Sequence, residues 1–354
     1  MPKLYFKHLD SLRFYAVFLV IFAHIFQIWT WQENTVLLFP MGSLGVMIFF
    51  VLSGFLITKI LLAIDENEPF QVSFKNFYAR RSLRIFPIYY LYLLIIFIFN
   101  LENIHQAGLM PWAYLTNIYI FNNDTWLNAN SHLWTLSIEE QFYIIWPFLI
   151  LTLKNNYRFL LGLFATIIAI SIASRVYLTL ENYSISPQIE VFTLANLDSL
   201  ALGGLFALLY QKNSKRLKTY ALPMIAGGIL GYYIFAWMKI MFGWQVLFWS
   251  VGKFFIVIFA GGLVLFALFS KTNKQNILHN KITIHLGKIS YGLYLYHNII
   301  VAHYDKIANF FFIPVGDSIV VKIILSLFFT IGIAQISFVI IEKPLLKLKA
   351  KFAS

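Results

Sequence analysis

An arginine and a histidine interrupt the first apolar segment, residues 11–30, and both are candidates for chemistry. An ionisable side chain inside a membrane is costly and therefore points to a function. Arg13 and His24 are eleven residues apart, which places them on one face of a helix, about 16 Å apart along its axis. Because imidazole can accept a proton near neutral pH, His24 is a candidate general base. A structural hydrogen bond to a neighbouring helix is the alternative.

Two adjacent carboxylates, Glu139 and Glu140, lie in the apolar segment 132–153. If this segment runs inward from the outer surface, they lie roughly 10 Å below it, at the depth expected for His24. A carboxylate can orient a histidine as a general base. Neighbouring residues on a helix point about 100° apart, so only one of the two can face His24, and the sequence does not say which. A structural ion pair is the alternative.

Three arginines, Arg80, Arg81 and Arg84, lie within little more than one helical turn, at the start of the third apolar segment. Guanidinium groups bind phosphate in a bidentate manner. The cluster therefore favours a phosphate-bearing ligand, although a signal for membrane orientation would look the same.

Further polar or small residues lie inside other apolar segments. Ser53-Gly54 allows a helix or a ligand to approach the backbone closely, and helix packing is the simpler interpretation. Asp198 and His297 are buried polar groups for which a structural role is preferred over a catalytic one.

The elements that must position these groups are membrane-spanning helices. Of the 354 residues, 60% are hydrophobic and 12% are charged, whereas a globular domain carries about 25% charged residues. A soluble core, a disordered chain and a collagen-like fibre are thereby excluded. The chain has no cysteine, which excludes disulfides, thiolate metal sites and cysteine nucleophiles.

Apolar runs long enough to cross a bilayer recur along the chain. They predict an all-α polytopic membrane protein with about ten transmembrane helices. The predicted spans are 11–30, 44–63, 83–101, 132–153, 158–179, 192–211, 220–239, 245–269, 286–305 and 318–341, with 104–122 as an outer loop that could re-enter the membrane.

Basic residues are concentrated in alternate connecting segments, as the positive-inside rule requires. This pattern predicts that both termini are cytoplasmic, and it accounts for the net charge of +12. No basic stripe with interleaved exposed aromatic residues accompanies it, so nucleic acid is rejected as a partner. Basic residues in these segments include Arg80, Arg81, Arg84, Lys154, Arg158, Lys212, Lys215, Arg216, Lys218, Lys343, Lys347, Lys349 and Lys351.

At these residues the sequence resembles the membrane-bound acyltransferase-3 family of bacterial glycan O-acyltransferases. Elements similar to those of the family occur in its order along nearly the whole chain. They are Leu9-Asp10-Ser11-Leu12-Arg13 with His24, Phe49 to Gly54, Arg80 to Arg84, His132 to Tyr143, Ile289 to His297, and Ile341-Glu342-Lys343-Pro344.

The resemblance implies a multi-pass enzyme of the bacterial cytoplasmic membrane, consisting of a single integral-membrane domain, 1–354, without an appended soluble domain. Such an enzyme takes an acyl group, usually acetyl, from cytoplasmic acyl-CoA and delivers it to a hydroxyl of an extracytoplasmic glycan. Acetyl-CoA is then a co-substrate and no metal is needed. The lipid bilayer is a partner, and periplasmic or glycan-assembly proteins are candidates for others.

The resemblance also suggests roles for individual residues. His24, Arg13, Glu139 and Glu140 are expected in the catalytic group; Arg80, Arg81, Arg84 and Ser53 in the acyl-CoA site; and Asp10, Trp134, Asp198 and His297 in supporting positions.

These inferences together predict one continuous passage through the membrane, lined by arginines at its cytoplasmic end and by His24 further out. Either direct transfer with His24 as general base or a covalent acyl-histidine relay would fit it. The 102–131 loop is the expected acceptor region, but neither the acceptor nor the acyl group can be read from the sequence. A transporter or flippase of a lipid-linked glycan is the alternative, although the second half of the chain has no counterpart of the Arg13–His24 pattern.

Overall fold

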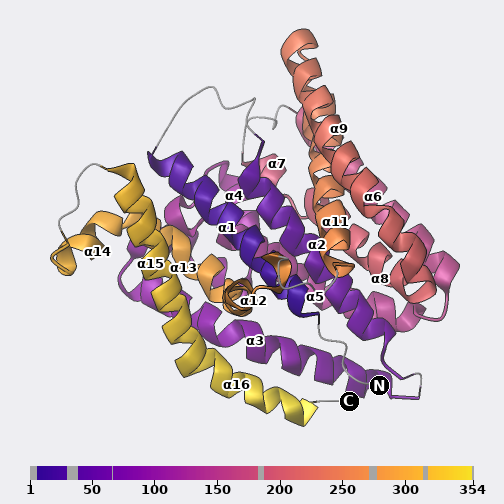
Figure 1. The fold of residues 1–354 in the computed structure, drawn as a ribbon, viewed down its shortest axis with the longest axis horizontal. Helices are drawn as coiled ribbons and strands as arrows, with labels where there is room; N and C mark the ends of the chain where they lie inside the picture. Colours follow the sequence, from indigo (N-terminus) through magenta and orange to yellow (C-terminus); the bar gives the residue numbers. More distant parts are fainter. Residues whose placement is uncertain are drawn as a thin grey trace.

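The structure is a computed structural model that describes residues 6–29, 39–65, 67–181, 187–270, 277–313 and 318–352. These residues form helices and connecting turns, without a β-strand among them (Figure 1). The outer end of the predicted span 11–30 includes residue 30, which lies outside the described residues.

Sixteen α-helices are joined by short 3-10 and π-helical turns. The α-helices are α1 (Lys7–Trp29), α2 (Met41–Leu62), α3 (Phe70–Ile98), α4 (Thr116–Asn123), α5 (Leu133–Leu153), α6 (Tyr157–Leu180), α7 (Gln188–Val191), α8 (Leu197–Thr219), α9 (Ala221–Phe242), α10 (Gln245–Leu247), α11 (Lys253–Leu268), α12 (Lys281–Lys288), α13 (Ser290–Ala302), α14 (Tyr304–Phe310), α15 (Ile319–Ser337) and α16 (Lys343–Leu348) in the described part of the chain. The turns used below are η1 (Leu101–Ala107), η2 (Pro111–Ala113), η3 (Asn128–Asn130), η4 (Leu194–Asn196), η5 (Phe248–Gly252) and η8 (Lys349–Phe352).

The prediction of an all-α polytopic membrane protein is confirmed. Within the described ranges, eight helical segments are long and apolar enough to cross a bilayer. They are Lys7–Phe26, Met41–Leu62, Phe70–Ile98, Asn128–Leu153, Tyr157–Leu180, Ala221–Phe242, Gln245–Leu268 and Ile319–Leu348.

Two of the ten predicted spans do not meet these criteria as single helices. Residues 192–211 fall on η4 and α8, and the C-terminal part of α8 is rich in polar and basic residues. Residues 286–305 are divided among α12, α13 and α14, and α13 has 13 residues, which is too short to span the hydrocarbon core alone. Residues 104–122 form short helical pieces, η1, η2 and α4.

Close packing of α2 against its neighbours forms the centre of the molecule. A Cβ atom at Gly54 of α2 would collide with the carbonyl oxygen of Leu200 in α8, and one at Gly203 of α8 would collide with that of Val51. The two glycines therefore let α2 and α8 pack backbone against backbone. Gly54 is therefore a helix-packing residue, as the simpler interpretation of Ser53-Gly54 predicted.

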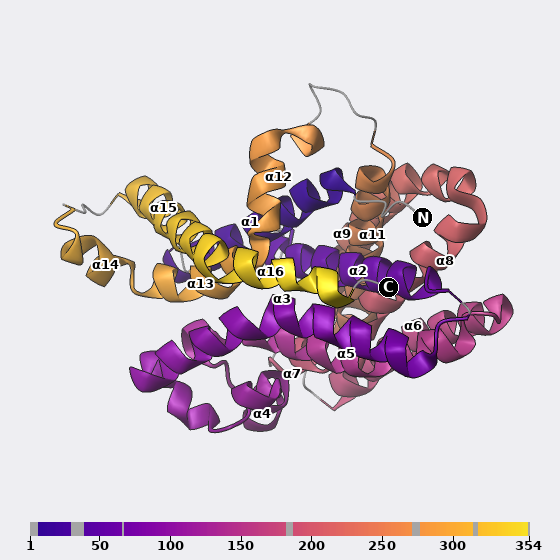
Figure 2. The same cartoon turned by 90° about the horizontal axis from the view of Figure 1, so that it is seen from below.

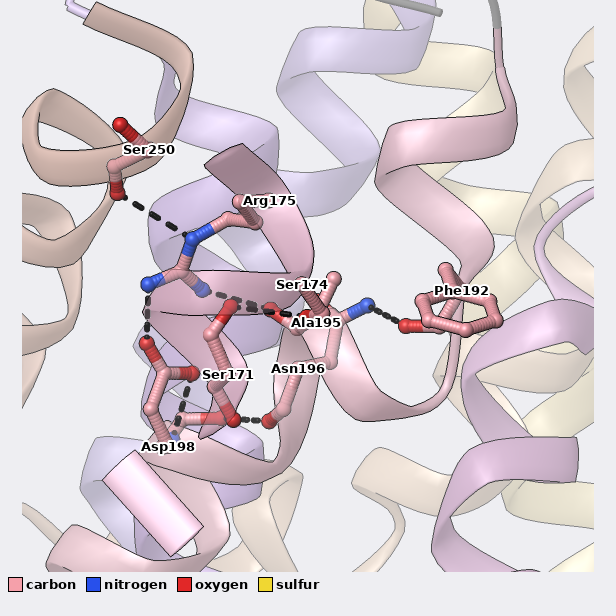
Figure 3. Close-up of polar contacts among 9 residues, drawn as sticks. Ser171, Ser174, Arg175, Phe192, Ala195, Asn196, Asp198 and Ser250 are labelled. Carbon is pink, nitrogen blue, oxygen red and sulfur yellow. Dashed lines mark hydrogen bonds and ion pairs between the residues drawn. The ribbon is translucent and has the colours of Figure 1, made fainter. Parts of the chain in front are cut away.

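A buried ion pair fixes α6 to α8 and to the π-helical turn η5 (Figure 3). The guanidinium of Arg175 lies 2.7 Å from the carboxylate of Asp198, and both side chains are fully buried. It also donates to the carbonyl oxygens of Ala195 and Ser250. Asp198 thus has a structural partner, which explains how a carboxylate is accommodated in this interior.

The C-terminal helix α16 and the turn η8 run beside α3 (Figures 1 and 2). Tight packing also brings α12 against α1, since a Cβ at Gly287 would collide with the carbonyl oxygen of Asp10. The N-terminal part of α1, which carries Asp10 and Arg13, is thereby held against α12.

Candidate active site

Two adjacent cavities contain most of the predicted site residues. The first, here called the arginine cavity, is lined by Arg13, Arg81 and Arg84 together with Ser53 and Glu139. The second, the histidine cavity, is lined by His24, His132, Trp134 and residues of the 102–131 loop. Val46 and Tyr294 line both cavities. The sequence predicted a single passage; the structure has two cavities that meet at these two residues, a boundary called here the shared wall.

Cations dominate the arginine cavity, a narrow space of about 80 Å³. Asp10 holds the guanidinium of Arg13 at 2.6 Å, and the guanidinium of Arg81 lies over the ring of Tyr143, 5.2 Å from its centre. Both contacts fix the orientation of a guanidinium group. With Arg84 also in the wall, the cavity is suited to an anionic group such as phosphate.

Arg80 occupies a different position from the other arginines of its cluster. Its guanidinium donates to the carbonyl oxygen of Phe352, 2.9 Å away, in η8, and it does not line the arginine cavity. Successive residues on a helix point about 100° apart, so Arg80 and Arg81 face different neighbours. Lys349 of η8 lies near the same arginines, and burial and then these arginines lower the pKa of its ammonium group to about 7.

The two glutamates have separate environments. A carboxylate oxygen of Glu139 accepts a hydrogen bond of 2.5 Å from the Ser53 hydroxyl, which in turn accepts one from the Tyr143 hydroxyl at 3.1 Å. Glu139 therefore belongs to the arginine cavity. Glu140 is buried, 8% exposed, and among the described residues one of its oxygens has no hydrogen-bond partner. It lines neither cavity.

His24 is paired with a second histidine rather than with a glutamate. Its Nδ1 lies 2.7 Å from Nε2 of His297, and the two rings are stacked with their centres 5.0 Å apart. Nδ1 of His297 lies 2.7 Å from the carbonyl oxygen of Tyr294, and a carbonyl oxygen can only accept. Nδ1 of His297 therefore carries a hydrogen.

This hydrogen determines the roles of the remaining ring nitrogens. In a neutral His297, Nε2 is then an acceptor, so His24 must donate from Nδ1. The lone pair of His24 is left on Nε2, on a residue that lines the histidine cavity. The structure thus places His297 rather than a glutamate against His24, because α13 rather than α5 brings a side chain to this ring nitrogen.

A whole-chain comparison identifies the group of proteins to which this site belongs. The family model described as "Acyltransferase domain" matches residues 6–341. The chain belongs to this acyltransferase family. The resemblance seen in the sequence is thereby confirmed.

Two longer proteins are similar in sequence to this chain. It is 29% identical to the peptidoglycan O-acetyltransferase OatA of Listeria monocytogenes over 97% of the chain and 56% of that protein. It is 26% identical to the O-acetyltransferase OatA of Staphylococcus aureus over 97% of the chain and 57% of that protein. The chain thus spans just over half the length of these relatives. No solved structure matches it.

The histidine cavity of this acyltransferase-family chain is far larger than the arginine cavity, about 710 Å³. Trp126 and Trp134 supply aromatic surfaces in its wall, and Asn128, Ser131 and Asn298 supply hydrogen-bonding groups. Aromatic and polar groups in a concave site suit a ligand with both apolar faces and hydroxyl groups. Glu102 and Glu190 are the acidic residues of this lining.

His132 and Tyr294 also belong to the site, although neither was singled out from the sequence. The ring nitrogens of His132 lie 3.0 and 3.1 Å from the carbonyl oxygens of Ala129 and Leu295, and its ring centre lies 5.2 Å from that of His297. A histidine at the start of the predicted span 132–153 was the available signal. In the described part of the chain, no cluster of three or more possible metal ligands occurs.

Proposed function

We propose that this chain transfers an acyl group, most often acetyl, from acyl-CoA in the arginine cavity to a hydroxyl of a glycan in the histidine cavity. The observation that carries the proposal is the His24–His297 pair, which leaves a lone pair on Nε2 of His24, a residue that lines the histidine cavity. The names of both similar proteins support acetyl as the acyl group, and the name of the Listeria protein supports peptidoglycan as the acceptor.

The donor would bind from the side of the basic connecting segments, which the positive-inside rule assigns to the cytoplasm. Arg13, Arg81 and Arg84 would bind its phosphate groups. Ser53 and Glu139 lie in the same wall and would bind groups nearer the thioester. The acceptor would then enter from the opposite side of a bacterial cytoplasmic membrane.

The reaction would take place at the wall shared by the two cavities. Nε2 of His24 removes the proton from the acceptor hydroxyl while the hydroxyl oxygen attacks the thioester carbonyl carbon. The carbon–sulfur bond breaks, a carbon–oxygen ester bond remains, and the proton on His24 passes to the sulfur of CoA. His297 holds the ring in the required tautomer throughout, as the orienting group of a catalytic triad does.

Direct transfer is favoured over an acyl-histidine relay by the shared wall, because it brings donor and acceptor to one place. A relay would instead leave the acyl group on Nε2 after CoA departs. Incubating the protein with labelled acetyl-CoA in the absence of acceptor, followed by removal of CoA, distinguishes the two. Direct transfer predicts no label bound to the protein.

The proposal is tested with purified protein in detergent, acetyl-CoA and soluble peptidoglycan strands. Release of free CoA thiol, matched by acetyl ester on the glycan, is expected for the wild type and lost in His24→Ala. His285→Gln is the control, because His285 is an exposed imidazole bonded to Gln335 and lines neither cavity. Undiminished transfer by a folded His24→Ala protein would refute the proposal.

A further inference from the structure

Tyr294 and Val46 form the wall between the two cavities, since both residues line both of them. Tyr294 is buried, 6% exposed, and lies on α13, one helical turn before His297. Val46 lies on α2 and is 7% exposed. A group at the boundary of the two cavities therefore lies beside these two side chains.

The side chain of Tyr294 is held in this wall by contacts of its hydroxyl group and of its ring. Its hydroxyl lies 2.7 Å from Oγ1 of Thr135 and 3.3 Å from the carbonyl oxygen of His132. When Thr135 donates to that carbonyl oxygen, the Tyr294 hydroxyl donates to Thr135. The ring also makes a T-shaped contact with the ring of Phe49, with centres 5.9 Å apart. A phenol fixed in this way acts as a rigid partition rather than as a loose side chain.

We propose that the ring of Tyr294, together with Val46, is the specificity-determining element that limits the length of the acyl group transferred. This inference rests on the proposed function. The thioester comes from the arginine cavity and the hydroxyl from the histidine cavity, so the acyl carbonyl carbon has to be attacked at the wall. The rest of the acyl chain then competes for space with the two side chains that form that wall.

Side-chain changes at residue 294 can test the partition without removing the support of the base. The group of Tyr294 that orients His297 is its backbone carbonyl oxygen, which any substitution retains. A shorter side chain widens the wall, whereas phenylalanine keeps the ring and loses only the hydroxyl. Selectivity should therefore follow the size of the side chain and not its hydroxyl group.

The test measures kcat/KM for acetyl-, butyryl- and hexanoyl-CoA with peptidoglycan strands as acceptor. Pocket discrimination is roughly 10-fold or more per methylene group, so Tyr294→Leu is expected to raise the butyryl-to-acetyl ratio by about 10-fold or more. Val46→Ala should raise it by a smaller factor, and Tyr294→Phe should leave it unchanged. Tyr296→Leu is the matched control, because Tyr296 lies on the same helix, bonds Ser337 and lines neither cavity.

An unchanged ratio in folded Tyr294→Leu overturns the inference. If that variant does not fold, Val46→Ala decides the question, because it widens the same wall by a small change: a raised ratio supports the inference and an unchanged ratio overturns it. An equal rise in Tyr296→Leu also overturns it, since general loosening of α13 would then be the cause. The proposed function fails separately, and the inference with it, if the wild type transfers no acetyl group at all.

Discussion

Removing the ring that orients His24 should reduce catalysis while leaving acyl-CoA binding intact. In His297→Leu the acceptor 2.7 Å from Nδ1 of His24 is lost, and the N–H group of His24 has no partner in its place. A buried donor without a partner costs about 1–3 kcal/mol. If that cost falls on the oriented base in the transition state, kcat decreases roughly 5- to 150-fold.

The assay is the initial rate of CoA thiol release at saturating acetyl-CoA and acceptor. The KM for acetyl-CoA should change little, because His297 does not line the arginine cavity. His297→Gln supplies an amide oxygen as a substitute acceptor and should recover most of the lost activity. His285→Gln, in which the replaced histidine is exposed, controls for the chemical change.

Two results would refute this reasoning. A folded His297→Leu protein with wild-type kcat would show that His24 does not need this partner. A His297→Gln protein as inactive as the leucine variant would show that the hydrogen bond is not what His297 contributes. Thermal unfolding of each variant in detergent separates loss of activity from loss of fold.

Further predictions concern the cations and the buried ion pair. Arg84→Gln should raise the KM for acetyl-CoA by about 10-fold or more, because a charge-assisted hydrogen bond is worth about 1.5–3 kcal/mol. Arg80→Gln should change this KM little, because Arg80 does not line the arginine cavity. Steady-state kinetics measures both. Arg175→Met leaves the buried carboxylate of Asp198 without its partner and should destabilise the fold by about 3–5 kcal/mol. The double variant Arg175→Met/Asp198→Leu removes that carboxylate as well, so it should unfold at a higher temperature than Arg175→Met alone. The lowered pKa of Lys349, about 7, means that the folded chain binds fewer protons than the unfolded chain between about pH 7 and 10, so stability rises with pH across that window. Unfolding temperatures measured from pH 7 to 9 should rise less in Lys349→Met than in the wild type.

Most of the fold could be predicted from the sequence, since the length and apolarity of a membrane helix are local properties. The segments carrying Arg13 and His24, Ser53-Gly54 and the two glutamates all became helices within a few residues of the predicted bounds. The segment around His297 was harder, because polar residues shorten its apolar run and the chain breaks there into α12, α13 and α14.

The partners within the site were less predictable, because they depend on which helices are neighbours. Glu139 and His24 were placed at similar depths, but depth does not fix lateral position in a bundle. The ring of His24 meets His297, 273 residues further along the chain. Arg175, a lone arginine within an apolar run, did carry a signal for a buried partner, and Asp198 is that partner.

Transfer across a sealed membrane tests the central claim most directly. Proteoliposomes would carry labelled acetyl-CoA only on the side of the basic segments and soluble peptidoglycan strands only on the other side. The proposed mechanism predicts acetyl ester on the glycan, strongly reduced in Arg13→Gln and absent in His24→Ala. Label that never reaches the glycan across an intact membrane, or transfer that persists without His24, would contradict it.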